Sequence, residues 1–123
     1  MKPVRTASHD ANHYIPRDFL RDICGGFEVT KIGLTIAYTA NFRGNRIVLI
    51  DFSAVGGVVG DWHIECVETM RYSWVEVKTP EAYAMKDHNL KPGEMWLRDN
   101  SGSWKMIVFN YDMEELMNWL TDE

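Results

Sequence analysis

The chain has 123 residues and a formal net charge of −5, with 46% hydrophobic and 25% charged residues. This length predicts one domain, and the composition excludes a body that is intrinsically disordered. No apolar run approaches the roughly 20 residues that span a bilayer, and the first residues lack the apolar segment of a secretory signal. We therefore expect a cytoplasmic protein, in its own cell or in a host cell, with no membrane partner.

The negative charge lies in the second half of the chain. Residues 1–61 carry seven basic and six acidic side chains, whereas residues 62–123 carry six basic and twelve acidic ones. A phosphate-backbone surface requires clustered Lys and Arg, so this balance makes direct binding of nucleic acid unfavourable. A weaker alternative is nucleic-acid contact through Arg43, Arg46 and Arg71.

A helix is predicted near the N-terminus. Residues 1–14 are polar and lack periodicity, and we expect them to form a flexible arm. Pro16 suits a first helical turn, and Leu20 and Ile23 belong to an apolar face that extends over 15–24. Two glycines follow directly, and they end the helix because glycine adopts the left-handed C-terminal conformation without strain.

The pattern then changes to a period of two. Alternating residues predict a strand over 34–42, and an apolar run predicts its partner over 47–52, with the turn at Gly44 and Asn45. The second strand is apolar on both faces except at Asp51, which indicates a central strand.

The later elements complete the predicted fold. They are strands over 62–67 and 72–77, a short helix over 80–85, a hairpin of 95–97 with 104–109, and a closing helix over 111–123. This order predicts a single α+β domain over 15–123. Its curved antiparallel sheet has about five or six strands, and the N-terminal and C-terminal helices pack on that sheet.

Several local motifs fall short of a chemical site. His9 and His13 have the spacing of a zinc-binding helix, but the catalytic glutamate is replaced and no third ligand follows, so both are expected on the exposed arm. The glycines within 56–60 lack the lysine of a phosphate-binding loop. Cys24 and Cys66 lie outside any CxxC pattern and are expected to be reduced. We expect no metal, no cofactor and no catalytic residue.

One set of residues could line a ligand pocket in the sheet. Pairing of Phe42 with Ile47 places Tyr38 opposite Asp51, where its hydroxyl can donate a hydrogen bond to that carboxylate. Tyr38, Asp51 and His63 would then line a pocket of a small-molecule-binding protein or small enzyme. A structural Asp–Tyr hydrogen bond is the favoured interpretation, and His63 is expected to be exposed.

The closing helix carries the strongest functional signal. Its apolar residues recur at helical spacing, and its polar face is acidic without any Lys or Arg. The acids are Asp112, Glu114, Glu115, Asp122 and Glu123. Acids near a helix N-terminus stabilise the dipole, but Asp122 and Glu123 at the other end oppose it. Trp119, at the edge of the apolar stripe, is a typical interface anchor.

These features favour a non-enzymatic protein-binding module. The partner would present a basic surface, and the acids of the closing helix with Trp119 would contact it. By analogy of class, the chain would be a phage or plasmid protein: a small acidic inhibitor or immunity-type protein that occludes the basic surface of a larger nucleic-acid-processing partner. The sequence leaves open whether the protein forms a homodimer.

Overall fold

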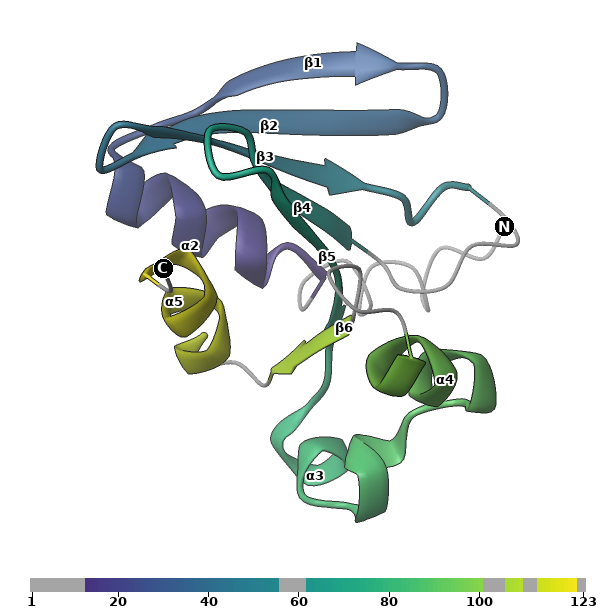
Figure 1. Cartoon of the computed structure of the whole chain (residues 1–123). Helices are drawn as coiled ribbons and strands as arrows, with labels where there is room; N and C mark the ends of the chain where they lie inside the picture. Colours follow the sequence, from purple (N-terminus) through teal and green to yellow (C-terminus); the bar gives the residue numbers. More distant parts are fainter. Residues whose placement is uncertain (1–12, 56–61, 101–105, 110–112, 122–123) are drawn as a thin grey trace.

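The computed structural model describes residues 13–55, 62–100, 106–109 and 113–121, and it shows a single α+β domain (Figure 1). A six-stranded sheet has its strands in sequence order. They are β1 (Glu28–Ile32), β2 (Thr35–Phe42), β3 (Asn45–Asp51), β4 (Trp62–Cys66), β5 (Arg71–Val77) and β6 (Met106–Phe109). The helices are α2 (Ile15–Cys24), α3 (Pro80–Tyr83), the 3₁₀ turn η1 (Lys86–Asn89), α4 (Pro92–Asn100) and α5 (Glu114–Thr121).

The prediction of an N-terminal helix is confirmed. In α2, Pro16 lies in the first turn, and Gly25 ends the helix with a φ of +78°. Leu20 is fully buried on the face that meets the sheet. Within the described ranges, no helix is both long and apolar enough to cross a membrane.

The hairpin of β2 and β3 forms, but the predicted register is wrong. Phe42 pairs with Asn45, so the two loop residues are Arg43 and Gly44, both with positive φ. Such a loop matches a type I′ turn, whose twist suits the flanking strands. The shift of the register by two residues places Ile36, and not Tyr38, opposite Asp51.

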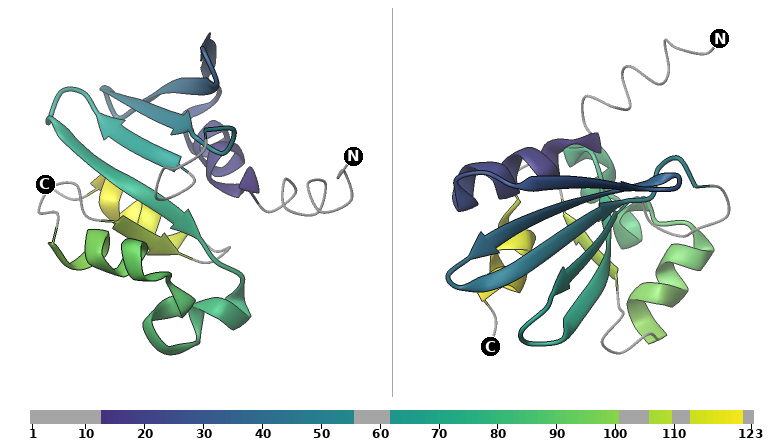
Figure 2. Two further views of the ribbon diagram at one scale, coloured as in Figure 1. Left: turned by 90° about the vertical axis from the view of Figure 1, so that its right-hand side faces the viewer. Right: turned by 90° about the horizontal axis from the view of Figure 1, so that it is seen from above.

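A strand that the sequence analysis did not separate forms the first edge of the sheet. Among the described strands, β1 pairs only with β2, and Ile32 and Thr35 flank a two-residue loop in which Gly33 has a φ of +60°. β3 is central, as predicted, with β2 and β4 on either side. The sheet is twisted but not strongly curled (Figure 2).

The predicted hairpin of 95–97 with 104–109 is wrong. Residues 95–97 lie inside α4, which begins at Pro92, and the carboxylate of Glu94 accepts a hydrogen bond from the backbone amide of Lys91 at 3.0 Å. β6 pairs with β5 in parallel. Parallel neighbours require a crossover connection, which α3, η1 and α4 provide.

The two faces of the sheet carry different apolar clusters. The first face, which contains Leu49 and Trp62, packs against α2 and α5 in the main core (Figure 1). The buried members of this core are Leu20, Tyr38, Ala40, Phe42, Ile47, Leu49, Trp62, Ile64, Cys66, Val75, Met113, Leu116 and Leu120. On the second face Leu90 forms a smaller cluster with Trp74 and residues of the crossover. The expectation that both terminal helices pack on the sheet is confirmed.

Candidate functional site

A buried polar cluster lies where α2 meets the first face. The Nε2 atom of His13 is 2.9 Å from Oδ1 of Asp51, and the backbone amide of Ser53 donates to the same oxygen at 2.9 Å. The indole of Trp62 donates to the carbonyl of His13 at 3.0 Å, and the two rings stack with centroids 4.6 Å apart. The cluster therefore fastens the start of α2 to β3 and β4.

This cluster corrects two predictions. His13 is buried, with 3% of its surface exposed, so it does not belong to an exposed arm. His9 lies outside the described residues. Asp51 bonds His13 and not Tyr38. Burial opposes the charge of Asp51, but the hydrogen bonds from His13 and Ser53 outweigh burial and hold the pKa of this carboxyl below its usual value.

The residues of the predicted ligand pocket do not converge. Tyr38 and Asp51 lie on the first face, whereas His63 pairs with Ile50 and lies on the second. The prediction that His63 is exposed is wrong, because the residue is 4% exposed and its ring packs edge-on against Trp74, with centroids 5.0 Å apart. Burial lowers the pKa of His63. Its Nδ1 lies 3.5 Å from a carboxylate oxygen of Glu65.

The acidic closing helix is exposed only in part. Glu114 is exposed, but Glu115 accepts a hydrogen bond from the hydroxyl of Tyr83. Trp119 is half-buried against the main core, and the guanidinium of Arg71 lies 4.4 Å from the centre of its ring. Asp112, Asp122 and Glu123 lie outside the described residues.

The β1 edge exposes more apolar surface than the other strands for which the structure gives side-chain exposure. We use this name for the strand Glu28–Ile32 with the following turn residues Gly33 and Leu34. Every residue of the strand is exposed, and Val29, Ile32 and Leu34 are 57%, 63% and 66% exposed. Because Ile32 and Thr35 close a two-residue hairpin, the ladder directs the backbone groups of Val29 and Lys31 toward solvent.

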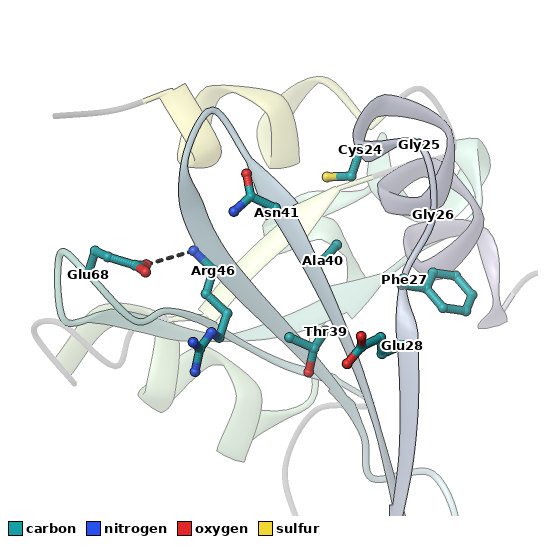
Figure 3. A pocket seen from close by; sticks show the side chains of 10 residues that line it. All are labelled: Cys24, Gly25, Gly26, Phe27, Glu28, Thr39, Ala40, Asn41, Arg46 and Glu68. Carbon is teal, nitrogen blue, oxygen red and sulfur yellow. Dashed lines mark hydrogen bonds between the residues drawn. The ribbon is translucent and has the colours of Figure 1, made fainter.

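Two hollows flank the turn between β2 and β3. The first, of about 520 Å³, lies between the end of α2, the strands beside the turn, and the turn that carries Glu68 (Figure 3). Glu68 accepts a hydrogen bond from the backbone amide of Arg46 at 2.6 Å. The Cys24 thiol lines the hollow, but burial raises its pKa, which opposes formation of the nucleophilic thiolate.

The second hollow, also of about 520 Å³, is basic. Its described lining is Phe42, Arg43, Asn45, Thr69, Arg71, Leu120 and Thr121. Arg43 and Arg71 were both considered as candidate contacts in the sequence. That they line the same hollow depends on the register of β2 to β5. Neither the second hollow nor the β1 edge was identified from the sequence, although Arg43-Gly44 is a recognisable turn pair and Glu28–Ile32 has strand-forming residues.

The described residues contain no cluster of metal ligands, and their cysteines are unpaired. Among the described residues, no group of three or more His, Cys, Asp or Glu side chains could hold a metal ion. Cys24 and Cys66 are both free thiols.

Comparison with known proteins identifies no relative from which a function could be inferred. No protein-family model matches the chain, and neither a curated protein nor a solved structure shows significant similarity to it.

Proposed function

We propose that this chain is a non-enzymatic protein-binding module whose β1 edge pairs with an extended segment of a larger partner. The exposure of Val29, Ile32 and Leu34, on an edge that no other described strand pairs with, carries this proposal. Sheet edges of natural proteins are normally short, charged or covered, because they invite pairing with another chain. An exposed edge strand with apolar side chains such as Val29 and Ile32 is suited to strand addition, in which backbone hydrogen bonds give affinity and alternate side chains give specificity.

The side chains of the β1 edge would contact the added strand on both faces of the sheet. Val29 is paired with Tyr38 and therefore shares the first face, whereas Ile32 lies on the second. A partner strand would cover both side chains and satisfy the outward backbone groups of Val29 and Lys31. One contact on each face would also define the register of the added strand.

The charge of the chain favours a basic partner. The net charge is −5, and the exposed Glu114 lies on the acidic closing helix. Such charge steers association with a Lys- and Arg-rich surface and makes the rate of association depend on salt. The negative charge supports a finer assignment: an inhibitor or immunity-type protein that covers the basic surface of a nucleic-acid-processing enzyme.

The experiment begins with capture of the partner at low salt, release at high salt and identification by mass spectrometry. Calorimetry with the purified partner then compares Val29→Lys with Met70→Lys. Both variants place the same charge at an exposed apolar residue, but Met70 lies away from the edge. We expect Val29→Lys to weaken binding at least about tenfold and Met70→Lys to have little effect. Equal affinities of the two variants would contradict strand addition at β1.

A second pair of variants examines the charge contribution. Glu114→Lys should weaken binding and flatten its salt dependence, whereas Glu81→Lys, the same change on exposed α3, should do so less. Equal effects would mean that net charge alone guides the partner. Sedimentation of the free protein tests the competing hypothesis that β1 pairs with a second copy of this chain. A dimer that Val29→Lys dissociates would support that hypothesis in place of a different partner.

A further inference from the structure

The basic hollow beside the β2–β3 turn brings together two guanidinium groups from distant parts of the sequence. Arg43 belongs to the turn itself, and Arg71 begins β5. Arg71 reaches the same end of the sheet because it pairs with Cys66, which pairs with Ile47 beside the turn. Both arginines line one volume of about 520 Å³.

Arg71 is held in place before any ligand arrives. Its Nη1 donates to the carbonyl of Trp119 at 2.7 Å, and its Nε donates to the hydroxyl of Thr69 at 3.3 Å. The guanidinium also lies over the ring of Trp119, 4.4 Å from the centroid. A guanidinium positioned in this way loses little conformational freedom when it binds an anion.

Arg43 faces the same hollow from the exposed side. The backbone of Arg43 has a φ of +53° in the turn, and the guanidinium carbon lies 4.9 Å from the centre of the Phe42 ring. Asn45 and Thr121 add an amide and a hydroxyl to the lining, and none of the described lining residues is acidic. Among the described residues, neither arginine forms an ion pair with a carboxylate.

We propose that this hollow binds a small phosphate monoester, with the phosphate between Arg43 and Arg71. Paired guanidiniums recognise phosphate oxygens through charge-assisted, often bidentate hydrogen bonds. A volume of about 520 Å³ lies in the range of sites for small organic ligands and exceeds the needs of a phosphate ion. The organic part of the ligand would lie against Phe42 and Leu120. This site is separate from the β1 edge and does not depend on the proposed protein partner.

Two features oppose anion binding in this hollow and limit its affinity. Thr121 ends α5, and the carboxyl end of a helix is the negative end of its dipole. Asp122 and Glu123 follow directly in the sequence. We therefore expect modest affinity for inorganic phosphate, and replacement of both acids by their amides should strengthen it.

The variant Arg43→Asn removes one guanidinium and is expected to retain the fold. Asn-Gly is the preferred pair for a type I′ turn, so the hairpin keeps its geometry. Arg71 is less suitable, because its bond to the carbonyl of Trp119 also caps α5. The matched control is Arg46→Asn, which makes the same charge change at an exposed arginine lining the other hollow (Figure 3).

The measurement is an NMR titration at constant ionic strength, first with inorganic phosphate and then with adenosine 5′-monophosphate. We expect saturable shifts at Arg43, Asn45, Thr69 and Arg71. Arg43→Asn should reduce affinity roughly tenfold, and Arg46→Asn less than about twofold, because a hydrogen bond to a charged group is lost only in the first. Tighter binding of the monophosphate would assign the ligand to a phosphate monoester, whereas equal affinities would reduce the site to one for free phosphate. Shifts that do not saturate, or equal losses in both variants, would overturn the proposal.

Discussion

The two faces of the sheet differ in what holds their helices. On the first face, α2 and α5 share a continuous apolar core with the strands. On the second, Leu90 is the buried centre of a small cluster, and Lys78 bridges Glu76 and Glu94 at 3.5 and 3.9 Å. Hydrophobic burial dominates folding energy, whereas ion pairs add little net stability once the cost of desolvation is counted. The first face therefore carries most of the stability, and the second can change with less effect on the fold.

The largest effect should come from the same substitution made on each face. Leu20 is fully buried on the first face, and Leu90 is 8% exposed on the second. We expect Leu20→Ala to lower the free energy of unfolding by about 4 kcal/mol and Leu90→Ala by about 2 kcal/mol, because a cavity in a large core relaxes less. Urea unfolding of both variants measures the difference, and equal losses would contradict an unequal division of stability.

The next effect concerns the buried polar cluster of the first face. Asp51→Asn should lower the free energy of unfolding by about 2 kcal/mol at neutral pH, because His13 then loses a charged acceptor. The pKa of Asp51 is lowered by folding, so its stabilisation is present above the usual value of 3.8 and disappears as pH falls through the folded value. Unfolding of wild type and Asp51→Asn at several pH values should show curves that converge in acid. A constant difference down to strongly acidic pH would exclude this source of stability.

The smallest effect belongs to the second face and occurs at a higher pH. Folding lowers the pKa of His63, so the unfolded chain binds a proton before the folded protein does. Stability should therefore decrease as pH falls below the usual histidine value of 6.5, and this slope should disappear in His63→Gln. Thermal unfolding between neutral and mildly acidic pH measures it. A slope that persists in the variant would have to come from another group.

The first face could be predicted largely from the sequence. Periodicity identified α2 and the apolar stripe of α5, since each of these helices buries one regular set of side chains. The central strand β3 was identified by an apolar run that only Asp51 interrupts. Leu20 and Leu116 both lie in the main core. The two helix predictions succeeded because burial of one face leaves a period in the sequence that does not depend on distant contacts.

The second face and the candidate sites could not be predicted in this way. Met95, Trp96 and Leu97 form an apolar run too short to separate a strand from a helix. They lie in α4, which belongs to the crossover between the parallel strands β5 and β6. The register of β2 with β3 depended on a positive φ at Arg43, which a side chain adopts only at some cost. The bond between His13 and Asp51 joins residues that no local pattern connects.

The parallel strand β6 has a consequence for the order in which the chain folds. β1 to β5 form a succession of neighbouring antiparallel pairs, so the contacts among them connect residues close in sequence. β6 reaches β5 only after the whole crossover, and α5 follows it. Closing a long loop slows the formation of such contacts. We therefore expect the antiparallel strands to assemble early, and Met113, Leu116 and Leu120 to enter the main core in a late step.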